Sequence, residues 1–138
     1  MLLPLRLSGW GKAGTQTYEN GVLTLAHDYS CSLEDWDNHN VPVNDPAFRF
    51  YCNDVKVTER PATLSTEGLQ AGIYDYGNGG WPDVFPCEIG DTMRITFVCT
   101  DDYGLTYEFT IERWTVSEGD TTEEVQVDSD NYPELSWK

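Results

Sequence analysis

The sequence predicts an all-β protein folded as an antiparallel β-sandwich of seven to nine strands. Apolar residues recur at every second position in several segments, which is the period of a strand with one buried face. Glycine, proline, asparagine and aspartate separate these segments at short intervals, as turns do. No segment shows the period of a helix. With 138 residues, of which 39% are apolar, the chain has the length of one domain and can bury a core.

The N-terminal region contains the first predicted strands. Alternating leucines over residues 3–7 indicate a first strand. Residues 15–18 and 22–25 are β-prone runs on either side of Asn20-Gly21, a pair that tolerates the positive φ of a tight hairpin turn. Beyond the turn the alternation continues as far as Leu33, so the second arm of this hairpin is predicted to be a long strand.

The central part of the chain predicts a second hairpin. Residues 34–46 are rich in turn-forming types and predict an exposed loop. Alternation begins again over residues 48–52, is interrupted at Asn53-Asp54, and resumes with the other parity at Val55. A change of parity at two turn-forming residues indicates either a hairpin or a bulge, and we favour the hairpin.

A weaker strand is predicted over residues 69–76, followed by a glycine-rich loop over residues 77–83. This loop carries Trp81 but lacks the Lys-Ser/Thr pair and the following helix of a phosphate-binding loop. We therefore interpret it as a connection that does not bind phosphate.

The clearest unit runs from residue 83 to residue 116. Residues 92–100 and residues 105–112 each alternate between apolar and polar side chains. The turn that joins them ends in Gly104, which supplies the positive φ expected of a four-residue turn. These features predict a hairpin whose outward residues include Thr110 and Glu112 and whose buried face contains Met93, Ile95, Phe97, Cys99, Leu105, Tyr107, Phe109 and Ile111.

Two parts of the chain differ in composition. Residues 1–117 are the predicted β-sandwich domain. Residues 118–138 contain seven acidic residues and one lysine, and a short strand is predicted over residues 123–128. Like charges repel one another along such a segment and should loosen it, so an ordered segment needs something that holds it. We therefore expect it to pack on the domain or on a partner, most simply a neighbouring subunit.

Several strings in the 83–116 unit follow a definite order of turns and strands: Phe85-Pro86-Cys87-Glu88-Ile89-Gly90-Asp91-Thr92, Ile95-Thr96-Phe97, Thr100-Asp101-Asp102-Tyr103-Gly104 and Tyr107-Glu108-Phe109-Thr110. A proline–glycine turn, an alternating strand, a T-D-x-x-G turn and a last alternating strand follow one another. This order resembles the immunoglobulin-like modules of bacterial, phage and hyalin-repeat proteins. The resemblance implies an immunoglobulin-like or related sandwich, and a non-catalytic domain used for display, adhesion or assembly.

The net charge of −16 excludes one class of function and leaves another open. A free-standing nucleic-acid binder neutralises phosphates with clustered lysine and arginine, and the eight basic residues here are scattered singly. The acids lie mainly in turns, at outward strand positions and in the C-terminal segment, as the surface of a sandwich requires. An acidic inhibitor that imitates nucleic acid and occupies the basic channel of a host defence protein is one alternative.

The start of the chain does not resemble a secretion signal, because Pro4 and Arg6 interrupt its apolar run. No stretch approaches the roughly 18 apolar residues of a membrane span, so we expect no membrane partner and a location in a virion or the cytoplasm. Free thiols are then expected at Cys31, Cys52, Cys87 and Cys99. Cys52 and Cys99 fall on apolar faces and are interpreted as core residues, and no C-x-x-C pair indicates a zinc site.

Two carboxylate pairs are the weak candidates for calcium ligands: Asp35 with Asp37, and Asp128 with Asp130. Neither pair matches the spacing of an EF-hand loop, and solubilising loop acids are the simpler interpretation. No G-x-S-x-G motif is present, and His27 lies on an apolar stripe, as a core residue does. We therefore predict no catalytic residues, no cofactor and no enzymatic activity.

The tryptophans are the candidate interface residues, because aromatic side chains are enriched in protein interfaces and stack on sugars. They are Trp10, Trp36, Trp81, Trp114 and Trp137, and the last four fall in loops, at the outward parity of a strand (Trp114) or in the C-terminal segment. The alternative interpretation is that they cap the ends of the sandwich or pack beneath loops.

The leading functional hypothesis is a non-enzymatic structural or binding component of a larger assembly, with a phage virion, as head decoration or tail, as its setting. Its partners would be protein subunits of that assembly, copies of this chain included, with no direct contact to nucleic acid. The acidic inhibitor and a carbohydrate-binding module that uses Trp36 or Trp81 as a stacking platform are the alternatives.

Overall fold

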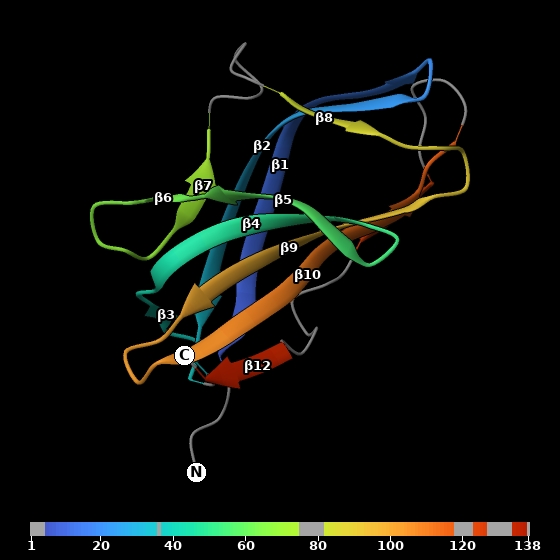
Figure 1. Ribbon diagram of the computed structural model, residues 1–138. Helices are drawn as coiled ribbons and strands as arrows, with labels where there is room; N and C mark the ends of the chain where they lie inside the picture. Colours follow the sequence, from blue (N-terminus) through green and yellow to red (C-terminus); the bar gives the residue numbers. More distant parts are fainter. Residues whose placement is uncertain (1–4, 36, 75–81, 118–122, 127–133, 138) are drawn as a thin grey trace.

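The computed structural model describes residues 5–35, 37–74, 82–117, 123–126 and 134–137, and for residues 8–10, 13 and the last two ranges it describes the backbone alone. The described residues form twelve strands in two antiparallel sheets, with no helix among them (Figure 1). This confirms the predicted all-β sandwich. The strands outnumber the predicted seven to nine partly because the connections contain two-residue strands, β3 (Asn40–Val41) and β6 (Thr63–Leu64).

Sheet I is built around a long N-terminal hairpin. Its strand order is β1 (Arg6–Glu19), β2 (Val22–Glu34), β7 (Ala71–Ile73) and β6. Two further strands, β3 and β8 (Asp83–Pro86), also pair with β2. The alternating leucines and the β-prone run before the first turn thus belong to one strand, β1, which contains a bulge between Leu7 and Gly9.

Sheet II is built around the predicted 92–112 hairpin. Its strand order is β11 (Glu123–Gln126), β10 (Leu105–Thr115), β9 (Thr92–Thr100), β4 (Asn44–Cys52) and β5 (Val55–Pro61). The last strand, β12 (Glu134–Trp137), also pairs with β10. Both described strands of the acidic C-terminal segment therefore lie along one strand of the sandwich.

The three predicted turns are confirmed by backbone geometry. Asn20 and Gly21 have φ values of 52° and 76°, and they close the β1–β2 hairpin. Asn53 and Asp54, at 50° and 66°, close the β4–β5 hairpin, so the change of parity there is a hairpin, as favoured from the sequence. Asparagine and aspartate adopt positive φ more readily than other side-chain-bearing residues, which explains why these dipeptides end their strands. Gly104 has a φ of 88° in the β9–β10 turn.

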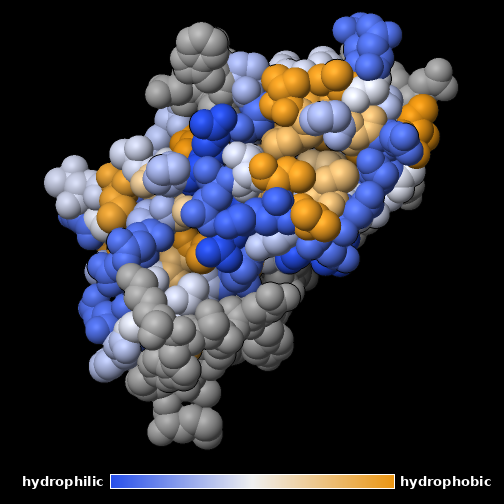
Figure 2. All heavy atoms as spheres, viewed as in Figure 1, coloured by the Kyte–Doolittle hydropathy of each residue, from blue (hydrophilic) through white to orange (hydrophobic). Residues whose placement is uncertain are grey.

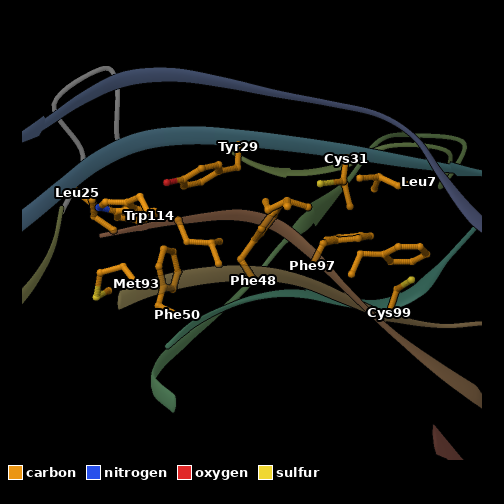
Figure 3. Close-up of a cluster of buried hydrophobic side chains, with 14 of the residues drawn as sticks. Leu7, Leu25, Tyr29, Cys31, Phe48, Phe50, Met93, Phe97, Cys99 and Trp114 are labelled. Atoms are coloured by element: carbon orange, nitrogen blue, oxygen red, sulfur yellow. The ribbon is translucent and has the colours of Figure 1, made fainter. Parts of the chain in front are cut away.

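The core lies between the two sheets and is formed by the residues that alternate inward. Figure 3 shows Leu25, Tyr29 and Cys31 of β2 facing Phe48, Phe50 and Phe97 of sheet II. Of the inward set predicted for β9 and β10, Met93, Ile95, Phe97, Cys99, Tyr107, Phe109 and Ile111 are buried, whereas Leu105 is half-buried and packs against the core. His27 is buried as predicted and its Nδ1 lies 2.8 Å from the hydroxyl oxygen of Tyr29.

The predicted exposed loop over residues 34–46 is shorter than expected. It contains β3, and β4 already begins at Asn44. Val43 is buried, and its N–H donates to the carbonyl of Gly68 at 3.2 Å. The weak strand predicted over residues 69–76 is present as β7, while most of the glycine-rich loop lies outside the described residues.

A bulge in β10 overturns two predicted orientations. The pairing of β10 with β9 shifts between Thr110 and Glu112, so one extra residue enters β10 and the parity of its side chains changes. Glu112, predicted to face outward, is 1% exposed, and Trp114 is also 1% exposed and lies in the core beside Leu25 (Figure 3). The strict alternation assumed from the sequence was wrong from this bulge onward.

Sheet I has different widths at its two ends. Strands β7 and β8 lie along the same side of β2: β7 pairs with Tyr29–Cys31 and β8 with Val22–Leu25. β6 lies beside β7 and extends the sheet, whereas no described strand lies beside β8. The β8 end of sheet I is therefore one strand narrower than its β7 end, and sheet II extends beyond it.

Candidate binding site

A groove lies on the open side of the sandwich, between β8 of sheet I and β5, the edge strand of sheet II. Its volume is about 310 Å³, and it is lined by Val57, Thr58, Arg60, Pro82, Asp83, Val84, Phe85 and Pro86. Figure 2 shows hydrophobic side chains gathered on the face over β5 and β8. A volume near 300 Å³ is at the lower end of the range for ligand pockets.

Two valines that line this groove, Val57 and Val84, are exposed, and so is Val55 at the start of β5. Val55, Val57 and Val84 are exposed to 64%, 45% and 55%. The β4–β5 pairing shifts between Phe50 and Tyr51, so Val57 is the extra residue of a bulge in an edge strand. The bulge, together with Lys56 and Pro61, protects the outer edge of β5 against uncontrolled strand pairing. The accessible part of this side of the molecule is therefore the groove, not that edge.

An ion pair at the base of the groove connects the two sheets. The Nε and Nη2 atoms of Arg60 in β5 donate to Oδ1 of Asp83 in β8 at 2.9 Å and 2.7 Å. Asp83 is only 3% exposed, because it shares the inward parity of Phe85. A buried carboxylate requires a partner of this kind, since leaving it unpaired destabilises the fold.

Arg60 satisfies only one oxygen of this carboxylate. The other oxygen, Oδ2, is buried and accepts no hydrogen bond from any described residue. Of the buried side-chain polar atoms to which the described residues supply no hydrogen bond, Oδ2 of Asp83 is the one whose residue lines the groove. Asp83 thus brings an unused acceptor to the groove, while its negative charge is already compensated by Arg60. This arrangement can bind a group that donates a hydrogen bond.

A second ion pair between the sheets lies on the other side of the sandwich. Nζ of Lys12 in β1 lies 2.7 Å from Oε1 of Glu112 in β10. Lys12 pairs in the β1–β2 ladder with Tyr29, whose hydroxyl group contacts His27. This pair lies within the sandwich and lines neither of the two surface hollows described here.

The outer face of sheet II carries a network of charged and polar side chains. Nε of Arg49 lies 2.6 Å from Oε1 of Glu59, and its Nη1 lies 3.0 Å from Oε1 of Glu108. Thr96 and Tyr51 both donate their hydroxyl protons to Oε2 of Glu108. Arg49 lowers the pKa of the Glu59 carboxyl group, whereas burial, and then the bond to Glu108, raises the pKa of Tyr51. The carboxylates of Glu59 and Glu108 therefore already have partners within this network.

A smaller hollow of about 120 Å³ lies near the β9–β10 turn, lined by Leu5, Val41, Pro42, Asp101, Asp102, Tyr103 and Tyr107. Oδ1 of Asp101 accepts the N–H groups of Tyr103 and Leu105, and Oδ2 accepts the hydroxyl proton of Tyr107 at 3.0 Å. Burial, followed by this bond to Asp101, raises the pKa of Tyr107 to about 12. Asp101 therefore stabilises the turn, as its sequence context predicts, and offers no unused oxygen.

The calcium candidates are not assembled into a site in the described part of the chain. Oδ1 of Asp35 accepts the N–H groups of Asp37 and His39 at 2.9 Å and 3.0 Å, which stabilises its own loop. The bond from His39 is the main reason that the pKa of Asp35 is lowered. Asp128 and Asp130 lie outside the described residues, and no cluster of metal-binding side chains occurs among those that are described.

The structure separates the candidate interface tryptophans. Trp114 is a core residue and is therefore not available to a partner. Trp10 and Trp137 lie in β1 and β12, where only the backbone is described. Trp36 and Trp81 lie outside the described residues. Among the described side chains, the exposed apolar surface of the open side comes from valines.

All four cysteines are free thiols. Cys31 and Cys99 are buried in the core, as predicted for Cys99, whereas Cys52 is half-buried and packs against the core. Burial raises the pKa of the Cys99 thiol to about 12 and that of the Cys87 thiol to about 11. Thiols with such pKa values stay protonated near neutral pH and are poor nucleophiles.

The sequence interpretation missed Asp83, which was placed at the end of the glycine-rich loop. One local signal points to it: Asp83, Phe85 and Cys87 share a parity, so an aspartate begins an inward-facing set. Arg60 carries no comparable signal, because its role depends on the position of β5 opposite β8.

Comparisons of the chain with protein-family models, curated proteins and solved structures find no match. The described residues contain no helix that is long and apolar enough to cross a membrane.

Proposed function

We propose that this chain is a non-enzymatic binding or structural component of a larger assembly, and that the open side of its sandwich is the contact surface. The observation that carries the proposal is a pair of exposed valines, Val57 and Val84, that line one groove, with exposed Val55 nearby in the same strand as Val57. Isolated apolar residues are normal on a surface, but a contiguous group beside a groove is typical of an interaction site.

A phage virion, in its head decoration or its tail, is the assembly that we favour. The resemblance of residues 83–116 to immunoglobulin-like modules supports this setting, since such modules serve display, adhesion and assembly. The pairing of β11 and β12 with β10 is compatible with it, because the acidic C-terminal segment is anchored to the sandwich at two places.

The nucleic-acid mimic is the second candidate, and its support is the net charge of −16. Mimicry requires rows of free carboxylates on one face. On the outer face of sheet II, Arg49 binds both Glu59 and Glu108, so those two acids do not form such a row. Salt separates the two candidates, because binding to a basic channel weakens steeply with ionic strength whereas binding through valines does not.

Photocrosslinking in the producing cells tests the proposal. A photoreactive amino acid replaces Val57 or Val84 in the groove, and Leu64, an exposed residue of β6, is the control position. We expect the groove positions to yield one defined protein adduct, identified by mass spectrometry, that Leu64 does not yield. If positions 57 and 84 give no adduct, or the same adducts as position 64, the open side is not a contact surface.

A further inference from the structure

At the narrow end of sheet I, the described residues place no strand beside β8. At the wide end, β6 lies beside β7 on the side away from β2. At the narrow end, the corresponding place beside β8 contains no described strand, and the groove beneath β5 lies there. One extended segment in this place would continue sheet I as β6 continues it at the other end.

The open edge of β8 presents hydrogen-bonding groups to this space. In an antiparallel ladder, alternate residues bond to one neighbouring strand and the residues between them point the other way. The N–H of Cys87 donates to the carbonyl of Gly21 at 3.0 Å, so Phe85 and Asp83 also direct their backbone groups to β2. The N–H and C=O of Val84 therefore point away from β2, towards the space. The other outward residue of β8 is Pro86, which offers a C=O but no N–H, so Val84 supplies the one N–H of β8 at this edge.

The unused oxygen of Asp83 defines the chemistry of one position in the incoming segment. Paired residues of adjacent strands place their side chains on the same face, so the residue beside Asp83 points into the groove. Oδ2 of Asp83 requires a hydrogen-bond donor there. Because Arg60 lies within 2.9 Å of the same carboxylate, a second cation would be repelled. A neutral donor, from serine, threonine, asparagine or glutamine, fits this position.

The neighbouring inward position has different chemistry. Two residues along β8, the inward side chain is Phe85, and the groove here is bounded by Val57 and Pro86. An apolar side chain fits beside Phe85. The charge of −16 repels an acidic segment and also repels a second copy of this chain, so it favours a different protein whose segment carries no acidic residues.

We infer that an extended segment of a partner protein binds as an added strand beside β8, under β5. It bonds to the backbone of Val84, places a neutral hydrogen-bond donor on Oδ2 of Asp83 and places an apolar side chain on Phe85. This is recognition by strand addition, in which backbone bonds supply affinity and alternate side chains supply specificity. The inference rests on the proposed function and names the class of segment that the open side binds.

A peptide array tests the inference directly. Nine-residue peptides alternate Ser, Thr, Asn or Gln at one inward position with Val, Ile, Leu or Phe at the next, and two matched sets replace the donor by Glu or by Ala. The full-length chain, labelled with a fluorophore, is applied to the array, and affinities of the best peptides are measured by fluorescence anisotropy. We expect binding by donor peptides, and binding weaker by about tenfold or more for the Glu and Ala sets.

Two variants connect the binding to the groove. Val84→Pro removes the N–H at the open edge, and Asp83→Asn replaces an acceptor by an amide, so each should weaken the best peptide by about tenfold or more. Val84→Thr, which keeps the N–H, and Glu88→Gln, which removes an exposed acid nearby, are the matched controls and should bind normally. Circular dichroism shows whether each variant folds. If Asp83→Asn does not fold, Val84→Pro still tests whether the segment binds at the edge of β8.

The inference is overturned if no donor peptide binds, or if Val84→Pro binds as well as Val84→Thr. Binding of a second copy in place of peptides, seen as a dimer by native mass spectrometry that Val84→Pro abolishes, also overturns the choice of partner. These failures are distinct from failure of the proposed function. If crosslinking at position 57 or 84 yields a defined partner while peptides do not bind, the open side is a contact surface of another kind.

Discussion

The two sides of the sandwich each carry an ion pair that joins the sheets, and they use it differently. On the closed side, Lys12 of β1 pairs with Glu112 of β10, and both groups lie largely inside the fold. On the open side, Arg60 of β5 pairs with Asp83 of β8 beside a groove. Here Arg60 is 42% exposed, compared with 21% for Lys12.

This difference follows from the widths of the sheets. On the closed side, neither of the two hollows is lined by Lys12 or Glu112, so the charges serve only the fold. On the open side, where the described residues place no strand beyond β8, a similar pair lines a groove, and Oδ2 of Asp83 lies next to it. A buried ion pair is therefore a structural feature or part of a binding site according to what covers it.

Breaking the closed-side pair should have the largest effect on stability. Glu112→Leu leaves the ammonium group of Lys12 without its carboxylate, and breaking a buried pair in this way costs about 3–5 kcal/mol. The free energy of unfolding is measured by urea denaturation. The double variant Lys12→Met with Glu112→Leu should recover most of the loss, because no unpaired charge remains. A Glu112→Leu variant as stable as the original chain would contradict the structural role of the pair.

Breaking the open-side pair should cost less. Arg60→Met leaves the carboxylate of Asp83 without its described donor, which costs about 1–3 kcal/mol, at the lower end because water reaches this side. The same urea experiment measures it, with Lys56→Met in the same strand as the control. A loss equal to that of Glu112→Leu would show that the two sides are equally closed.

Exposed valines of the open side should contribute almost nothing to stability. Val57→Thr and Val84→Thr should change the free energy of unfolding by less than about 0.5 kcal/mol, as exposed positions usually do. Ile95→Val, in the core, is the comparison and should cost about 0.5–1.5 kcal/mol. If a valine variant cost more than Ile95→Val, its side chain would belong to the core and not to a contact surface.

Thiol labelling should distinguish the buried cysteines from the half-buried Cys52 without any change to the stability of the protein. Burial raises the pKa of Cys87 to about 11 and of Cys99 to about 12, so the reactive thiolate forms only as the pH rises towards those values. Labelling by a disulfide reagent at pH 8 should be slow, with Cys52 first and Cys31 and Cys99 last. Peptide mapping by mass spectrometry gives the order, and unfolding in urea should make all four rates similar. Early labelling of Cys99 would contradict its burial.

Much of the fold could be predicted because its determinants are local. Asn20-Gly21, Asn53-Asp54 and Gly104 adopt positive φ in turns, and each ends an alternating run at the predicted place. The bulges could not be predicted in the same way. The extra residue in β10 before Glu112 breaks no local rule, and only pairing with β9 reveals that Glu112 and Trp114 turn inward.

The candidate site was less predictable than the fold, because its parts come from different sheets. Arg60 and Asp83 are each an ordinary charged residue of a short strand. Their distance and the free oxygen of Asp83 depend on where β5 lies over β8. The tryptophans, chosen for their residue type alone, include one that the structure places in the core.

The sequence by itself determined the strand period, the turns, the burial of the alternating apolar faces and the strongly acidic surface, because backbone preference and hydrophobic burial act over a few neighbouring residues. The tertiary structure decided which sheet each strand joins, where the bulges reverse a face and where sheet I stops short. These depend on contacts between residues far apart in the chain, such as Arg60 with Asp83 and Lys12 with Glu112. The groove lies where β5 of sheet II faces β8 and no described strand of sheet I lies beyond β8.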